Sequence, residues 1–500
     1  MHGLLQRLLK TTAAYQVGDV VSKVFAVALL PVYTRHVSQA QYGVAELLMT
    51  AIILVSILIR LGIGEAFVRY HYADEDQARR DALARRATGF LIVATTLCAI
   101  PLAIFAAPLS QVIIDQRDPA VLRVAVLGLW TFTNLELAMS LLRVDERARA
   151  YAITTLANVL LTIALTVYLV VFHNQQARGL LLGNYAASTV VLLALWLSMA
   201  GRLLPRRGGA DHPRLQQLRY MLRFGLPTVP ADASVYALNL VDRYYLFHRY
   251  SAATAGVYSI AVKLAGVTAF VARAFQYSWP PLAYSITDDG EAARFYAFVA
   301  TYYLLVTGWL VAGLLLLGRW FTRLLTSPQF FHAYTALPWL ALGWALYGLF
   351  VIFVVIAGRA EVTTRNFAAA AVGLGANVIL LLVLTPSLGI AGAGLALAGA
   401  YVAMLTAMRL LTRNLFRVDF EWRRIAQLVL VLGGLSGAGE LLLPTSGAVG
   451  FATRALVALA LPVVLGLTGF YRPEERALLR TLLAQLRRAA GGRQAGTAAP

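Results

Sequence analysis

The chain has 500 residues, of which 59% are hydrophobic and only 13% are charged, and its formal net charge is +19. So few polar residues cannot coat a soluble globule of this length, which excludes a soluble protein and predicts a chain folded in a hydrocarbon solvent. The excess of basic residues predicts an anionic membrane surface as the partner and no nucleic acid, because no basic patch alternates with aromatic residues outside an apolar run.

Apolar runs set the expected fold. Runs of roughly 20 apolar residues recur about every 35 residues, and this length lets a helix cross a bilayer at about 1.5 Å per residue. The sequence therefore predicts an all-α membrane protein with about 14 transmembrane helices. The expected spans are 13–34, 43–68, 87–109, 120–142, 151–172, 179–200, 221–246, 254–279, 295–318, 334–357, 366–385, 389–411, 425–443 and 447–470. The first run is too long for a signal-peptide core, which predicts a retained anchor.

Arginines decide the expected orientation, because cytoplasmic loops of membrane proteins carry an excess of basic residues. Arginines crowd the segments after the second, fourth, sixth and twelfth spans, whereas the opposite loops 173–176 and 385–387 are short and poor in charge. Both termini are therefore expected in the cytoplasm.

Rare charged residues indicate an internal duplication. Three residues recur at one displacement of 213: Asp19 as Asp232, Gly43 as Gly256, and Arg60 as Arg273 (232 − 19 = 256 − 43 = 273 − 60). An even number of predicted spans separates the copies, so both cross the membrane in the same direction, as in a parallel repeat. The pattern predicts two six-helix lobes related by the repeat, plus two extra C-terminal helices. The expected boundaries are an N-lobe at 1–200, a cytoplasmic linker at 201–220, a C-lobe at 221–411, the last two spans within 412–470, and a cytoplasmic amphipathic tail at 471–500.

Three segments resemble a known family. They are Asn239–Tyr245 followed by Gly256–Ile260 and Trp279-Pro280, then Pro31–Arg35 leading to Gln41–Gly43, and finally Leu388–Gly394. Together with the span count and the repeat, they resemble the polysaccharide flippases of the multidrug/oligosaccharidyl-lipid/polysaccharide exporter superfamily. The resemblance implies a flippase of the bacterial cytoplasmic (inner) membrane. Such a protein moves a polyprenyl-pyrophosphate-linked oligosaccharide, a unit of O-antigen, capsule or exopolysaccharide, from the inner to the outer leaflet by alternating access. The implied partners are this substrate and membrane lipids, with a polysaccharide polymerase or assembly complex left open.

Basic residues inside the apolar runs are the candidate binding groups. A charge in the hydrocarbon zone costs about 2.5–3.5 kcal/mol by insertion scales, so these side chains are expected to line a water-filled cleft between the lobes. Ammonium groups and guanidinium forks in such a cleft suit the oxygens of a pyrophosphate. The candidate substrate-binding residues are Lys23, Arg60, Lys263 and Arg273. The alternatives are lobe-to-lobe or headgroup anchoring for the arginines and an interfacial position for Lys263.

Acidic residues within the spans have two interpretations. Asp19 and Lys23 lie four residues apart on one helix face, so they either neutralise each other or link transport to a proton or cation. Asp232, the repeat copy of Asp19, shares this coupling or ion-pair assignment. Glu136 and Glu440 are lone acids in apolar spans and are candidates for coupling or gating.

Two further features allow a structural or a functional interpretation. Asp242-Arg243 is interpreted as a local pair that stabilises the fold. Aromatic residues near the start of the second lobe suit either an interfacial belt or sugar stacking. They are Tyr236, Tyr244, Tyr245, Tyr277, Trp279 and Tyr284.

No cofactor and no enzymatic chemistry are expected. Cys98 is the single cysteine, the seven histidines are not at metal-ligand spacing, and no phosphate-cradling glycine loop is present. Two other functions remain open. An ion-coupled multidrug exporter of the same fold would need an acidic cavity. A membrane polymerase or ligase acting on lipid-linked sugars would need a sizeable outer loop.

Overall fold

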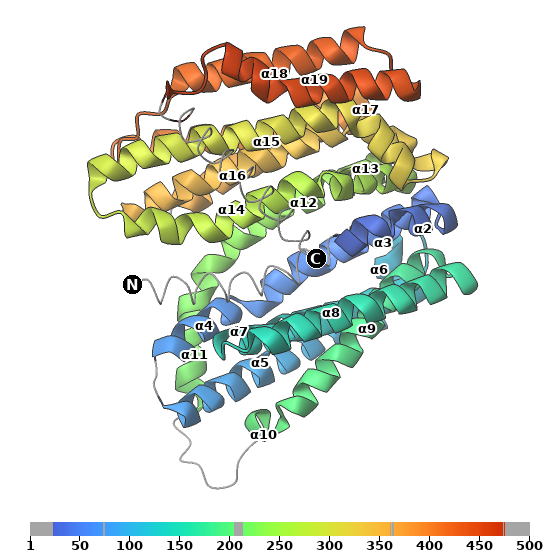
Figure 1. The fold of residues 1–500 in the computed structure, drawn as a ribbon. Coiled ribbons are helices and arrows are strands. Elements are labelled where there is room, and N and C mark those ends of the chain that lie inside the picture. The colour runs from blue at the N-terminus through green and yellow to red at the C-terminus, as the bar shows by residue number, and fades with distance from the viewer. Residues whose placement is uncertain are drawn as a thin grey trace, which may run out of the picture. The chain divides into compact units, whose positions relative to one another are not determined.

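A computed structural model describes residues 24–73, 76–204, 214–360, 362, 365–473 and 475. Within these ranges every regular element is a helix (Figure 1), so the predicted all-α fold is confirmed. The described residues form two compact units, one drawn from 1–280 and 319–416 and the other from 281–318 and 417–500.

The first half of the chain contributes a bundle of long helices joined by short ones. They are α2 (Leu30–His36), α3 (Gln39–Arg60), α4 (Ile63–Ala73), α5 (Gln77–Ile104), α6 (Ala106–Ile114), α7 (Pro119–Val144), α8 (Ala148–Val167) with a π-helical turn η1 (Tyr168–Phe172), α9 (Gln176–Ser198) and α10 (Ala200–Leu203).

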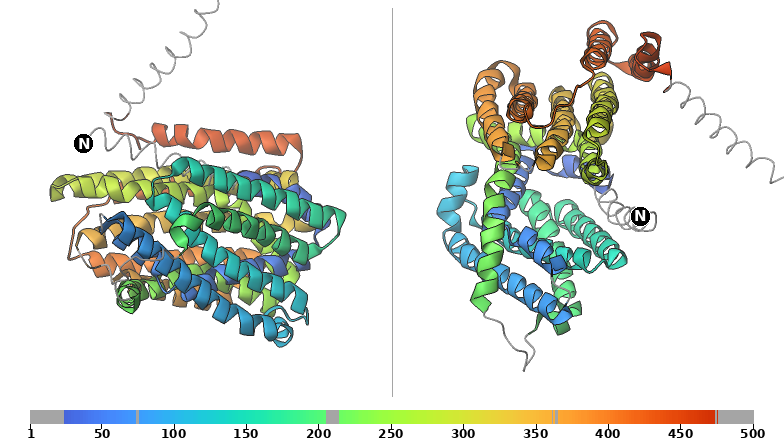
Figure 2. Two further views of the ribbon diagram at one scale, coloured as in Figure 1. Left: turned by 90° about the horizontal axis from the view of Figure 1, so that it is seen from below. Right: turned by 90° about the vertical axis from the view of Figure 1, so that its left-hand side faces the viewer.

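The second half begins with a connecting helix that packs against α4 and α5. Its elements are α11 (Arg214–Gly225), η2 (Leu226–Thr228), α12 (Val229–Arg249), α13 (Ala252–Leu264), α14 (Gly266–Ser285), α15 (Asp289–Leu325), η3 (Pro328–Thr335), α16 (Leu337–Arg359), α17 (Arg365–Thr412), α18 (Trp422–Leu442) and α19 (Gly447–Leu467). The right-hand view of Figure 2 looks nearly along the long helices and shows α11 running across them.

The number of membrane-spanning helices differs from the prediction for identifiable reasons. Ten described helices are long and apolar enough to cross a membrane, or up to 11 with the α13–α14 pair, which is bent by 50°. The predicted spans 366–385 and 389–411 are counted as one in α17, although non-helical Gly389 (φ 57°, ψ −135°) divides it into two helices, as the two spans predicted. The predicted span 221–246 corresponds mainly to α12, which is too polar to be counted by composition. Half of the first predicted span, residues 13–23 of 13–34, lies outside the described residues.

The internal repeat extends to local structure. Ser38 accepts a hydrogen bond from the Gln41 backbone N–H at 3.3 Å and caps α3, and Ser251 accepts one from the Thr254 N–H at 3.1 Å and caps α13. These two caps also lie 213 residues apart (251 − 38). A serine at this position satisfies an N–H group that the first helical turn leaves without a partner. The two copies therefore start their corresponding helices in the same way.

The repeat glycines are the point at which α3 and α13 make their closest approach. A Cβ on Gly43 would lie 1.9 Å from the backbone oxygen of Ala252, and a Cβ on Gly256 would lie 2.1 Å from that of Gln39. Only glycine lets two membrane helices approach this closely. The repeat-related helices thus pack backbone to backbone at these glycines.

We expect Gly43→Ala to destabilise the protein by about 1–3 kcal/mol, because the added methyl group meets backbone that cannot rotate away. Gly375→Ala on α17 is the matched control, since a Cβ there meets nothing within 4 Å. Thermal unfolding of both purified variants in one detergent measures the difference. Equal melting temperatures for the two variants would show that the glycine contact is unimportant.

Ion pairs tie together the loops at the ends of the first bundle that are expected in the cytoplasm. Arg202 pairs with Asp81 at 2.7 Å and with Asp145 at 2.5 Å, which joins α10 to the start of α5 and to the end of α7. Burial, reinforced by the charge of Arg80, lowers the pKa of the nearby His71 imidazole. A neutral His71 is therefore favoured beside these paired charges.

Candidate substrate site

A buried charged network lies where α3, α12 and α13 meet. The Glu46 carboxylate is 7% exposed, and its Oε1 lies 2.5 Å from Nζ of Lys263. Arg243 approaches the same carboxylate at 3.9 Å and donates a hydrogen bond to Thr50. The Lys263 ammonium also lies 5.1 Å from the centre of the Tyr42 ring. Lys263, a candidate substrate ligand, is thus bound to an acid of the other half of the chain.

The repeat explains the position of this network. Lys263 is the repeat counterpart of Thr50 (263 − 213), and Glu46 corresponds to Ser259 (259 − 213). Two related helices that pack across a pseudo-twofold axis make each contact twice, with the roles of the two helices exchanged. The sequence reasoning missed Glu46, because its repeat counterpart is uncharged. The available signal was an acid within the apolar run 43–68.

Asp242 and Arg243 have different partners, so interpreting them as a local pair was wrong. The Asp242 carboxylate accepts hydrogen bonds from Tyr258 at 2.8 Å and from Asn377 at 2.7 Å. Arg243 instead reaches Glu46 and Thr50. Consecutive residues point about 100° apart around a helix, which directs these two side chains to different neighbouring helices. Both residues hold the fold together, through contacts of long sequence separation.

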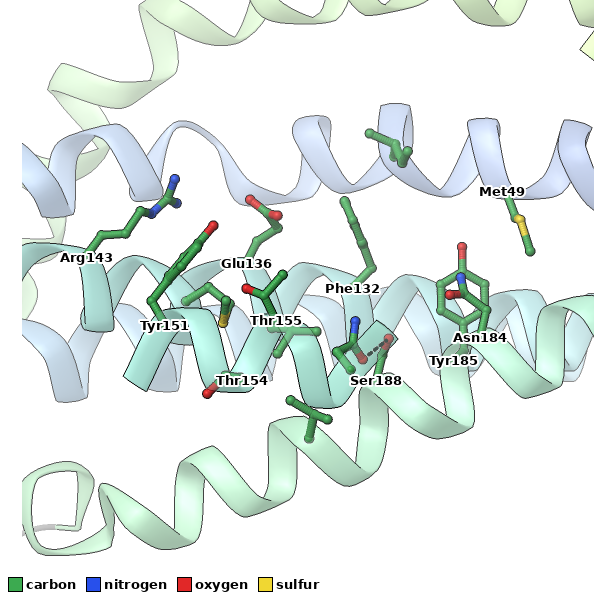
Figure 3. Close-up of a pocket in the computed structure, with 15 residues that line it drawn as sticks. Met49, Phe132, Glu136, Arg143, Tyr151, Thr154, Thr155, Asn184, Tyr185 and Ser188 are labelled. Carbon is green, nitrogen blue, oxygen red and sulfur yellow. Dashed lines mark hydrogen bonds between the residues drawn. The ribbon is translucent and has the colours of Figure 1, made fainter. Parts of the chain in front are cut away.

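Arg60 lies at the C-terminal end of α3 and is paired with an acid. Its Nη1 is 3.7 Å from Oε2 of Glu136 on α7, and its side chain is 20% exposed. Glu136 is therefore not the lone acid that the sequence suggested. It lies beside a cavity between α3, α7, α8 and α9 (Figure 3).

Arg273 is the most open of the described candidate ligands. Its guanidinium lies 5.8 Å from the centre of the Trp344 ring, and its side chain is exposed on α14. Within the described part of the chain no carboxylate lies at salt-bridge distance from it. The charges of Glu65 and Arg60 both act on Asp232, and those of Arg273 and Asp232 both act on Tyr347. Arg60, Asp232 and Arg273 therefore belong to one electrostatic neighbourhood.

The remaining candidates fall into two groups. Asp19 and Lys23 lie outside the described residues, so their pairing stays a prediction. Glu440 is paired, because Arg454 of α19 contacts its carboxylate and is fully buried. Arg454 also donates to the backbone oxygens of Pro444 at 3.0 Å and Leu443 at 3.1 Å. These contacts close the α18–α19 turn and favour a structural role for Glu440.

Comparison with known structures defines the class of fold. The chain is similar to the lipid II flippase MurJ in an inward closed conformation, with a TM-score of 0.73 and 14% identity over 94% of this chain and 100% of that one. It is also similar to a multidrug resistance MATE family transporter of the MOP superfamily in an inward-facing conformation, with a TM-score of 0.60 and 14% identity over 83% and 95% of the two chains. The chain therefore shares the multi-helical fold of these two proteins.

The sequence comparisons give the family. Residues 8–282 match the family of polysaccharide biosynthesis proteins, and the chain belongs to it. The Lsg locus putative protein 1 of Haemophilus influenzae is 24% identical over 282 residues, which are 56% of this chain and 66% of that protein. The match thus spans just under two thirds of that relative's length.

Proposed function

We propose that this protein is a flippase that moves polyprenyl-pyrophosphate-linked oligosaccharide from the inner to the outer leaflet of the cytoplasmic membrane. The observation that carries the proposal is Arg273, an exposed guanidinium on a membrane helix with no carboxylate at salt-bridge distance among the described residues. Such a charge is costly unless a water-filled cleft or an anionic ligand receives it. Membership of a polysaccharide biosynthesis family supports a lipid-linked sugar as that ligand.

In this mechanism the pyrophosphate is held by guanidinium groups, and no covalent bond changes. Arg273 and Arg60 offer planar forks that match phosphate oxygens, and release of Arg60 from Glu136 frees it for that role. Lys263 contributes to the positive field only when its contact with Glu46 loosens. Glu136, which pairs with Arg60 at 3.7 Å, is the acid that must respond when Arg60 binds the anion.

In the proposed alternating-access cycle, contacts between the repeat-related helices form the outer gate. With both termini in the cytoplasm, the start of α3, the start of α13 and η3 lie at the outer side. There Ser327 donates its N–H to Thr34 Oγ1 at 3.0 Å, and Gln329 donates to the Thr34 backbone oxygen at 2.8 Å. These bonds and the glycine contact close the outer side. Release of the sugar into the outer leaflet requires their separation together with the Glu46–Lys263 pair.

A deletion strain tests the function. Without this protein, lipid-linked oligosaccharide should accumulate in the cytoplasmic membrane while surface glycan is lost, and the gene supplied in trans should reverse both changes. Normal surface glycan with increased sensitivity to cationic drugs would instead favour the ion-coupled exporter. Exported but unpolymerised glycan units would favour the polymerase or ligase.

A further inference from the structure

The first compact unit contains a cavity of about 370 Å³ between α3, α7, α8 and α9 (Figure 3). In Figure 3, Arg143 and Tyr151 lie toward one end, and Met49, Asn184 and Tyr185 lie toward the other. The volume falls within the range of small-molecule sites, which combine apolar walls with a few converging polar groups. The lining residues are Met49, Ile53, Phe132, Leu135, Glu136, Met139, Arg143, Tyr151, Thr154, Thr155, Asn158, Asn184, Tyr185, Ser188 and Val191.

Uncharged polar groups from α8 and α9 converge on this cavity. Thr154, Thr155 and Asn158 line it from one face of α8, and Asn184 and Ser188 line it from α9. The Ser188 hydroxyl donates to Asn158 Oδ1 at 3.1 Å, which fixes the amide and leaves its N–H₂ group for another acceptor. Oγ1 of Thr155 is buried and has no hydrogen-bond partner in the part of the chain that the structure describes. A buried hydroxyl without a partner is costly, so a ligand that supplies one is favoured.

Aromatic side chains supply the apolar walls. Phe132 and Tyr185 line the cavity from α7 and α9. A Cβ on Gly128 would lie 2.5 Å from the Tyr185 ring, so the absence of a side chain at Gly128 leaves room for the ring. Rigid aromatic surface beside amides and hydroxyls suits a ring that is apolar on its faces and polar at its rim.

The charges at one end exclude a cationic ligand. Glu136 is 3.7 Å from Arg60 and is therefore neutralised, and Arg143 lies at the same end with its guanidinium bonded to Ser140 at 2.7 Å. Because Arg60 balances the charge of Glu136 from outside the lining, the Arg143 guanidinium leaves this end of the cavity net positive. A drug cation would be repelled there, whereas the anionic part of a ligand would be attracted.

We propose that this cavity is a subsite for a sugar ring of the lipid-linked substrate, with the hydroxyls and amides of α8 and α9 bonding the ring and the pyrophosphate held toward Arg60. This inference rests on the proposed flippase function and adds to it the element that recognises the glycan. It assigns sugar recognition to Thr155 and Asn184, which lie on helices other than those that carry Arg273 and Lys263.

Direct binding by the purified full-length protein in lipid nanodiscs tests the subsite. The two probes are polyprenyl pyrophosphate and the same lipid carrying one N-acetylglucosamine. Thr155→Val and Asn184→Leu should each weaken binding of the sugar-bearing probe by about tenfold, the effect of one lost hydrogen bond, and leave binding of polyprenyl pyrophosphate unchanged.

Thr162→Val is the matched control, because Thr162 Oγ1 is also buried on α8 without a partner among the described residues but does not line the cavity. This variant should bind both probes as the wild type does. If Thr155→Val and Asn184→Leu weaken both probes equally, or weaken neither, the sugar subsite is wrong while the flippase function stands. If the folded wild-type protein binds neither probe, the proposed function fails as well.

Discussion

Glu46→Ala should destabilise the protein by about 3–5 kcal/mol and abolish glycan export, because it leaves Lys263 and Arg243 buried without their acid. Removing one member of a buried ion pair costs more than the pair itself contributes, since the remaining charge keeps its desolvation penalty. Thermal unfolding of the purified variant measures the loss, and surface glycan in a deletion strain measures export.

The double variant Glu46→Ala with Lys263→Met is the control for this prediction. It removes both members of the 2.5 Å pair and should recover much of the lost stability. Export should stay low in the double variant, because the Glu46–Lys263 contact that forms and separates together with the outer closure is gone. A double variant no more stable than Glu46→Ala alone would contradict mutual neutralisation.

Arg60→Ala and Arg273→Ala should each abolish export of lipid-linked glycan without loss of the protein from the membrane. Lysine at either position should rescue export only in part, because it keeps the charge but loses the bidentate fork. Arg249→Ala is the matched control, since the Arg249 guanidinium lies over the Tyr250 ring at 5.8 Å, the same distance as that of Arg273 over Trp344. Surface glycan and membrane protein level are measured together in a deletion strain.

Two results would count against this assignment. Normal export by well-expressed Arg60→Ala and Arg273→Ala would remove both arginines from the substrate site. Equal loss of export in Arg249→Ala would indicate that guanidinium groups stacked on aromatic rings support the fold in general.

The fold was largely predictable because its signals are local or periodic. Apolar run lengths predicted most of the helices, and the displacement of 213 residues predicted the related helices α3 and α13. The repeat also identified Gly43 and Gly256, where the backbones of these two helices come into contact. The break between the predicted spans 366–385 and 389–411 is also present, because Gly389 adopts a positive φ that interrupts the helix there.

The partners within the site could not be predicted from the sequence. Glu46 meets Lys263, Glu136 meets Arg60, and Asp242 meets Asn377, and each pair joins residues far apart in the chain. Charge alone identifies residues that need a partner inside a membrane, but the choice among several acids depends on helix packing. The repeat identifies charges that are present in both copies, and Glu46 is not among them because its counterpart is uncharged. The assignments of Arg60, Arg273 and Lys263 to the substrate, and of Asp232 to coupling or an ion pair, therefore stay predictions.

The most direct test of the flippase proposal is the sidedness of the substrate in proteoliposomes. Purified protein is reconstituted with lipid-linked oligosaccharide extracted from the deletion strain, and a membrane-impermeant glycosidase or lectin then reports how much sugar is exposed outside. We expect the exposed fraction to rise with time in wild-type vesicles and to stay constant in Arg273→Ala vesicles and in protein-free vesicles. An exposed fraction that does not change with time in wild-type vesicles, although the reconstituted protein binds the substrate, would contradict the account.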